Sequence, residues 1–242
     1  MIRSLKSRIP EPLYQTYKSE FHKETHINRA IRTCRGTTYI EIGVRAGDCF
    51  RRIKATRKIG IDPSPLPSNY SLAPGESFIQ VTSDDFFVNY VEDCLDGHRI
   101  DVALVDGMHE FTQALRDILN LERFMSGKGV IFIHDCNPPN EGYTEKNPRY
   151  WNGDVWKVAY YLRVQRPDLH FFTLDCDWGV GVLTGFHPSS DLSYPSADIL
   201  ATYKQLGYDV LNRQRRKILH LCPYWYSYFF FNFVYPLRTE QS

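Results

Sequence analysis

Short apolar runs alternate with segments of helical spacing along most of this chain. Each of the first five runs ends on a glycine or a polar residue, as strands of a parallel sheet do where they meet a loop. The run IDVALV is apolar throughout, which is typical of a strand that is covered on both faces. The five predicted strands are Tyr39–Ile42, Lys58–Ile61, Ser77–Val81, Ile100–Val105 and Gly129–Ile133.

Helical patterns separate these runs and continue beyond them. Two further strands, His170–Leu174 and Gly179–Thr184, are joined by so few residues that they must pair antiparallel. The pattern therefore predicts an α/β fold, a doubly wound, Rossmann-like seven-stranded mixed sheet with a C-terminal antiparallel hairpin. Helices are predicted at about 10–33, 48–55, 84–95, 110–125, 154–164, 198–207 and 209–221.

The same pattern divides the chain into three parts. Residues 1–35 are predicted to form an N-terminal helical cap, 36–188 the core domain, and 189–242 a helical and aromatic extension. A chain of 242 residues suits one α/β core with additions. The formal net charge of +1 lacks the strong excess of basic residues that is typical of nucleic-acid-binding proteins, so no nucleic acid is expected as partner.

The six cysteines are dispersed and form no C-x-x-C pair. This spacing favours a reduced cytoplasmic chain over a disulfide scaffold or a zinc site. The N-terminus is basic without an apolar run, and the chain has no uninterrupted apolar stretch of about 20 residues. We therefore expect neither a secretory signal nor a membrane-spanning segment.

The turn after the first strand reads Glu41-Ile-Gly43-Val-Arg-Ala-Gly47. It lacks the close glycine pair that cradles a pyrophosphate, and the chain has no phosphate loop. Asp62 ends the second strand about 20 positions after Glu41, where a carboxylate accepts hydrogen bonds from ribose hydroxyls. A nucleoside without phosphate but with positive charge fits these residues, and S-adenosylmethionine is such a ligand.

Polar residues also follow the next three predicted strands. Ser83-Asp84 comes after the third, Asp106-Gly107 after the fourth and His134-Asp135 after the fifth. Because the carboxyl ends of parallel strands share one edge of a sheet, we expect these side chains to surround one ligand.

Together these residues and the segment Asp106-Gly107-Met108-His109 resemble a class I S-adenosylmethionine-dependent methyltransferase. The similarity covers roughly residues 36–185 and is greatest to the small-molecule O-methyltransferase group with a D-G-x-H motif after strand four. It implies a cofactor site at the strand ends and an acceptor that is a small molecule or a glycan intermediate. The implied cofactor contacts are Glu41, Gly43, Gly47, Asp62 and Asp106, with adenine-side contacts near Ser83 and Asp84.

Some members of that family bind a divalent metal at positions that correspond to Asp106, His134 and Asp135. Mg²⁺ prefers oxygen ligands, so a histidine at this place favours a centre without metal. In those relatives the third residue of a D-G-D motif is the candidate base, but Met108 stands there in this chain. His109 is then the candidate general base because an imidazole titrates near neutral pH, and His134 is the alternative.

The segment 136–153 is long and rich in Pro, Asn, Gly and Tyr, which is typical of a functional loop and predicts the acceptor side. The aromatic run from His220 to Leu237 is predicted to pack or to form a homodimer. A membrane contact is less favoured, because the run has no basic face of its own. Two other functions stay open: a nucleotide-dependent oxidoreductase on the same fold, and a non-catalytic scaffold.

Overall fold

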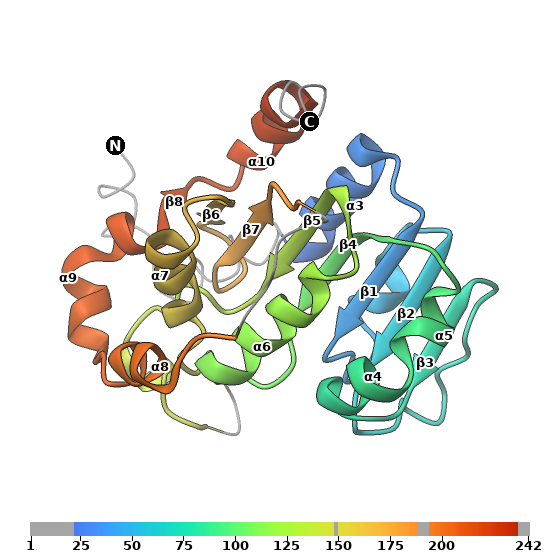
Figure 1. Cartoon of the computed structure of the whole chain (residues 1–242), viewed down its shortest axis with the longest axis horizontal. Helices are drawn as coiled ribbons and strands as arrows, with labels where there is room; N and C mark the ends of the chain where they lie inside the picture. Colours follow the sequence, from blue (N-terminus) through green and yellow to red (C-terminus); the bar gives the residue numbers. More distant parts are fainter. Residues whose placement is uncertain (1–21, 148–149, 188–193, 237–242) are drawn as a thin grey trace.

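A mixed sheet of eight strands forms the centre of the molecule in the computed structural model, which describes residues 22–147, 150–187 and 194–236. The strand order is β3-β2-β1-β4-β5-β7-β6-β8 (Figure 1). The strands are β1 (Thr38–Ile42), β2 (Arg57–Ile61), β3 (Glu76–Ile79), β4 (Ile100–Val105), β5 (Met125–Ile133), β6 (His170–Leu174), β7 (Val180–Thr184) and β8 (Leu221–Cys222).

Strands β1 to β5 are parallel, and β6 and β7 form the antiparallel hairpin. β7 also pairs antiparallel with β5, which makes the sheet mixed. The doubly wound α/β prediction is therefore confirmed. All five residues of β1 are buried, since layers of helices cover the sheet on both faces.

The predicted count of seven strands is wrong by one. The helix that was predicted to reach residue 221 ends at Leu219, because His220 adopts a left-handed backbone with φ 45°. Leu221 and Cys222 then pair parallel with Thr173 and Leu174 of β6. A strand of two residues is too short to show an alternating pattern in sequence.

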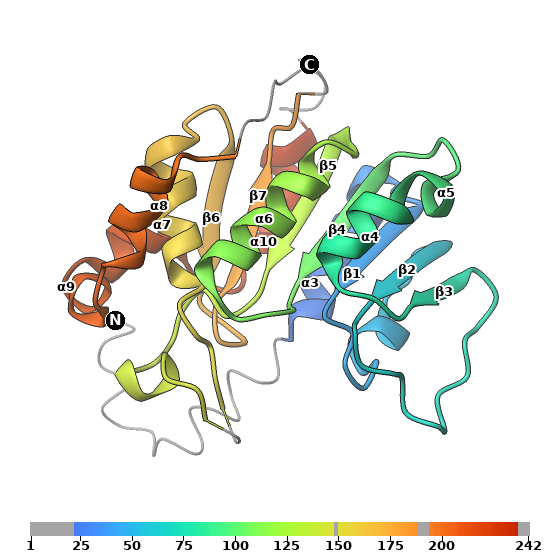
Figure 2. The same ribbon diagram turned by 60° about the horizontal axis from the view of Figure 1, so that its bottom comes forward.

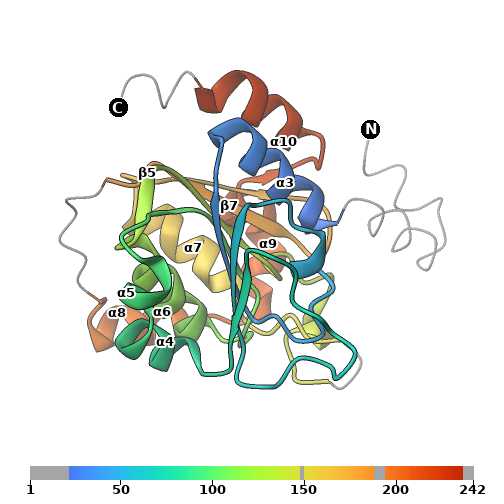
Figure 3. The ribbon, with the colours of Figure 1, turned by 90° about the vertical axis from the view of Figure 1, so that its right-hand side faces the viewer.

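One face of the sheet is covered by α3 (Lys23–Cys34), α10 (Tyr226–Phe229) and its π-helical continuation η3 (Phe230–Val234). Figure 3 shows α3 and α10 side by side over this face. Residues 10–21 of the helix that was predicted at about 10–33 lie outside the described part of the chain. The core on this face includes Ile27, Phe50, Val102, Phe132, Phe230 and Phe231.

The other face carries α4 (Ser83–Asn89), α5 (Val91–Leu95), α6 (Phe111–Glu122) and α7 (Trp156–Gln165). Two more helices, α8 (Ala197–Lys204) and α9 (Tyr208–Leu219), pack outside α7 (Figure 2). Among the described residues, no helix combines the length and the apolarity that a bilayer crossing requires.

The helix predicted at 48–55 is wrong. Only one 3₁₀ turn, η1 (Phe50–Arg52), forms there, and Ile53 is already extended with ψ 135°. The segment has few apolar residues to bury, and Phe50 and Ile53 anchor it in the core. The helix predicted at 84–95 is also divided, because Tyr90 departs from helical geometry between α4 and α5.

Candidate active site

The order of the strands reverses between β1 and β4, which is where a doubly wound sheet opens a crevice for ligands. The chain leaves β1 toward β2 on one side and leaves β4 toward β5 on the other. The Asp106 N–H donates to the Ile42 carbonyl at 2.9 Å, so the ends of these two strands are held together. Their following loops therefore form the floor of the candidate site.

Both predicted glycines of the first turn have positive φ, 90° at Gly43 and 77° at Gly47. A Cβ on Gly43 would lie 2.2 Å from the Asp106 carbonyl oxygen, so the end of β4 requires a glycine here. A Cβ on Gly47 would lie 2.3 Å from the ring of Tyr70. At both glycines the backbone therefore lies close to another part of the chain with no side chain between them. A closely bound ligand also needs backbone that is not shielded by a side chain.

Asp62 is nearly buried at the end of β2 and faces this turn. One carboxylate oxygen accepts from the Arg45 N–H at 2.7 Å, and the other accepts from the Ser64 N–H at 2.8 Å. Each oxygen retains acceptor capacity beyond its backbone partner. The side chain is therefore fixed in place and still able to accept from hydroxyl groups.

Glu41 is 1% exposed and accepts a hydrogen bond from the Tyr39 hydroxyl at 2.6 Å. Burial raises the pKa of Glu41 to about 8, although the Tyr39 hydrogen bond opposes the shift, and nearby Asp106 adds to the rise. At neutral pH this carboxyl group is largely protonated. A cationic ligand beside it would favour the ionised form.

Ser83 and Asp84 contact α6 in this structure. The Gln113 amide donates to the Ser83 hydroxyl at 3.3 Å and to Asp84 at 3.1 Å. Arg116 pairs with the other Asp84 oxygen at 2.8 Å. These bonds join α4 to α6, and the adenine-side role of the two residues stays a prediction.

Four sequence-predicted residues form one cluster: Asp106, His109, His134 and Asp135. His134 Nδ1 lies 2.9 Å from Asp106 Oδ1 and 3.1 Å from Asp135 Oδ2. Burial lowers the pKa of His134, but the two carboxylates outweigh it and raise the pKa well above its ordinary value. His134 is therefore a buried imidazolium between acids.

Sequence reasoning missed Lys23, the first residue of α3. Its ammonium lies 3.2 Å from Asp106 Oδ2. Burial lowers the pKa of Lys23, but Asp106 and Asp177 raise it by more. Because a short link joins α3 to β1, the helix runs back along the sheet and brings Lys23 to the edge where the strands end. Nothing in a lone lysine of a predicted cap indicates this contact.

Asp177, in the β6–β7 turn, was also missed. Its Oδ1 lies 3.6 Å from His134 Nε2, and its Oδ2 accepts from the Lys23 N–H at 2.8 Å. The signal was available, because β7 pairs antiparallel with β5 and so the hairpin turn lies at the edge where β5 ends. Although burial opposes the shift, His134 and Lys23 hold the pKa values of Asp106 and Asp177 well below their usual range.

His109 has a different environment from His134. Its Nδ1 contacts the Trp151 carbonyl oxygen, and the two rings lie 5.1 Å apart. A carbonyl only accepts, so Nδ1 carries a proton, and in the neutral imidazole the lone pair is on Nε2. Nε2 lies 3.4 Å from Asp135 Oδ2 and 4.0 Å from Asp106 Oδ1.

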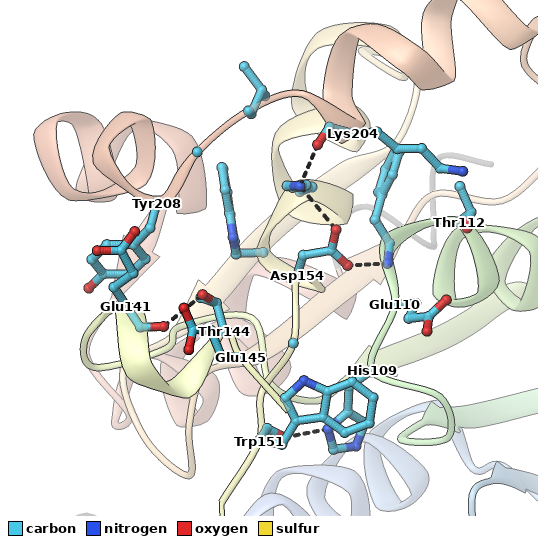
Figure 4. A pocket seen from close by; sticks show the side chains of 16 residues that line it. His109, Glu110, Thr112, Glu141, Thr144, Glu145, Trp151, Asp154, Lys204 and Tyr208 are labelled. Atoms are coloured by element: carbon cyan, nitrogen blue, oxygen red, sulfur yellow. Dashed lines mark hydrogen bonds and ion pairs between the residues drawn. The ribbon is translucent and has the colours of Figure 1, made fainter. Parts of the chain in front are cut away.

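A cavity of about 500 Å³ opens beside His109. Its walls come from the start of α6, from residues 141–145 and 151–157, and from the link between α8 and α9 (Figure 4). Lys157 is held by Asp154 at 3.0 Å and by the Lys204 carbonyl at 2.8 Å. Trp156 is buried in the core and also lines the cavity. Within the described ranges, the other acidic lining residues make no ion pair: Glu110, Glu141 and Glu145.

The predicted metal ligands do lie together, since donor atoms of Asp106, His134 and Asp135 are all within 4.8 Å of one another. The Lys23 ammonium, however, lies 3.2 Å from Asp106 Oδ2 and already balances the charge of that carboxylate. The nitrogen donor is also a poor match for Mg²⁺. As arranged here, the three residues do not fit a magnesium site.

Comparison with known proteins identifies the domain. Residues 40–136 match the family model described as a methyltransferase domain. Over this range the chain therefore has the sequence of a methyltransferase domain. The matched range of this methyltransferase domain includes the glycine turn, Asp62, Asp106, His109, His134 and Asp135.

Solved structures with this fold are also similar. The methyltransferase PaMTH1 from Podospora anserina, solved with S-adenosylhomocysteine bound, matches with a TM-score of 0.50 and 16% identity, over 73% of this chain and 88% of that chain. A putative caffeoyl-CoA O-methyltransferase from Staphylococcus aureus matches with a TM-score of 0.47 and 13% identity, over 75% of this chain and 95% of that chain. No curated protein sequence matches significantly.

Proposed function

We propose that this methyltransferase acts on a hydroxyl group of a small molecule or a glycan intermediate, bound in the cavity beside His109. The observation that carries the proposal is the hydrogen bond from His109 Nδ1 to the Trp151 carbonyl. His109 lines a cavity of about 500 Å³, and its Nε2, which holds the lone pair in the neutral imidazole, faces Asp135 and Asp106. An oxygen nucleophile needs a base in such a position, because its proton must leave as the methyl group arrives.

The cofactor side of the proposal rests on the first turn and on the end of β2. Gly43 and Gly47 present bare backbone, and Asp62 offers its remaining acceptor capacity to the ribose hydroxyls. Asp106 would supply negative charge toward the cationic part of the ligand, and so would Glu41 in the ionised form that a bound cation favours. When bound, S-adenosylmethionine supplies a methyl group that its sulfonium has already activated.

The protein must also orient the acceptor and remove the proton of its hydroxyl group. In the proposed step, His109 Nε2 accepts the hydroxyl proton, and the imidazolium that results is stabilised by Asp135 and Asp106. His134 does not serve as base in this scheme, because it already carries a proton. Its part, with that of Lys23, is to keep the carboxylates ionised and in place.

A transfer assay with isotopically labelled S-adenosylmethionine tests the proposal. We expect label on an oxygen of at least one acceptor in a panel of phenols, aliphatic alcohols and glycosides. Turnover is expected to be unchanged after dialysis against EDTA, because Lys23 and His134 already neutralise the acidic cluster. Loss of activity that Mg²⁺ restores would contradict the metal-free centre, and label found on nitrogen or carbon alone would contradict O-methylation.

A further inference from the structure

The C-terminal helical segment has a buried face and an exposed aromatic face. Phe230 and Phe231 are fully buried against the sheet. Trp225, Phe229 and Phe233 are spaced four residues apart and are 56%, 46% and 56% exposed. Residues with this spacing share one side of a helix, so these three side chains form a row on the surface, here called the aromatic row.

Two arginines of α3 lie beside this segment. Arg29 and Arg32 line a second cavity, of about 420 Å³, together with Tyr228 and Phe231. The Arg29 guanidinium lies 5.5 Å from the centre of the Tyr228 ring, and Tyr228 is itself 57% exposed. Figure 3 shows α3 and α10 side by side, and the shared cavity places both arginines beside Tyr228, the chain neighbour of Phe229 in the aromatic row.

The two arginines lack acidic partners among the described residues. Arg29 donates to the Ser227 hydroxyl at 2.5 Å, but neither guanidinium makes an ion pair with a carboxylate there. Burial and the nearby charge of Arg32 together lower the pKa of Arg29. Two like charges held this close favour an anionic partner, and guanidinium groups are well suited to phosphate.

A second copy of the chain fits this surface poorly. The four exposed aromatic side chains offer roughly 400 Å² of apolar area, about half of what one partner contributes to a stable interface. A two-fold contact through the same surface would also bring the arginines of both copies near one another. A lipid interface needs no such area, because amphipathic rings insert singly among headgroups.

We propose that this surface binds the headgroup region of an anionic phospholipid membrane. The aromatic row enters the boundary between headgroups and acyl chains, and Arg29 and Arg32 contact lipid phosphates. The aromatic run taken alone argued against this partner because it has no basic face. The fold supplies the basic residues from α3, which lies near the other end of the described chain.

Sedimentation of the full-length protein with vesicles tests the proposal. We expect binding to vesicles that contain phosphatidylserine, and much weaker binding to phosphatidylcholine alone or at high salt. The variant W225S/F229S/F233S should bind at least about tenfold more weakly. R29Q/R32Q should bind anionic vesicles about 25-fold more weakly, since each arginine near an anionic surface contributes roughly fivefold.

Matched controls replace exposed side chains elsewhere, Val88 on α4 and Arg213 on α9, and V88S and R213Q should bind as the wild type does. Brominated lipids should quench the tryptophan fluorescence of the wild type but not that of W225F, which tests insertion without relying on the triple variant. Absence of binding to anionic vesicles would overturn the proposal. So would a stable dimer that the triple variant dissociates, because a second copy would then cover the surface.

Discussion

Replacing His109 with asparagine is expected to lower kcat for a hydroxyl acceptor by about 10²- to 10⁴-fold. Asparagine keeps a polar group near the Trp151 carbonyl but has no lone-pair nitrogen to accept a proton. The KM for S-adenosylmethionine should change little, because the predicted cofactor contacts lie at the glycine turn and at Asp62. Steady-state kinetics with both substrates varied would measure the two effects separately.

The matched control for this variant is H98N, which changes an exposed histidine in the loop between α5 and β4. Its kcat should equal that of the wild type. A second check comes from the acceptor, since one whose hydroxyl is already ionised at the assay pH needs no base and should lose far less in H109N. An H109N enzyme with wild-type kcat on a neutral hydroxyl would remove His109 from the proposed mechanism.

Replacing His134 with glutamine is expected to lower the free energy of unfolding by about 3 kcal/mol or more near neutral pH. His134 is the buried cation among three carboxylates, at 2.9 Å from Asp106, 3.1 Å from Asp135 and 3.6 Å from Asp177. Without the His134 imidazolium, the Lys23 ammonium alone must balance the charge of the three carboxylates. Urea unfolding of the wild type and of H134Q would give the difference directly.

The direction of the pH dependence follows from the raised pKa of His134. A group whose pKa is higher in the folded state contributes fully below its unfolded pKa of about 6.5, and the contribution is lost as the pH rises through the folded pKa. The difference between wild type and H134Q should thus be largest at about pH 6 and smaller at about pH 9.

His220 provides the control, because its Nδ1 lies 3.1 Å from a backbone carbonyl rather than a carboxylate. H220N should show no such change of its stability difference with pH. A gap between wild type and H134Q that grows from about pH 6 to about pH 9 would mean that His134 is not held in its protonated form.

The sequence was most informative for strands that are buried on both faces of the sheet. The run IDVALV could only be a central strand, and β4 extends from Ile100 to Val105 as predicted. The positions of Asp62, Asp106 and Asp135 at strand ends followed from the same reasoning, since parallel strands place their ends at one edge. The hairpin was predictable because its connection was too short for a crossover.

Contacts between segments that are far apart in the chain could not be predicted from the sequence. The Lys23–Asp106 pair joins the N-terminal helix to the end of β4, and no local pattern encodes it. The partner of His109 is a main-chain carbonyl, which any residue at position 151 would supply. The helix predicted at 48–55 failed for a different reason. The local spacing of residues favoured a helix there, but the segment has too little apolar surface to bury, and only a 3₁₀ turn forms.

Calorimetric titration with S-adenosylhomocysteine tests whether this edge of the sheet binds the cofactor. We expect the wild type to bind one molecule per chain. D62N should bind about tenfold or more weakly, because it replaces a carboxylate acceptor at the ribose site with a neutral amide, provided its far-ultraviolet circular dichroism stays unchanged. Titration of folded wild-type protein without any heat of binding, or equal affinity in D62N, would contradict the assignment of this rim of the sheet as the cofactor site.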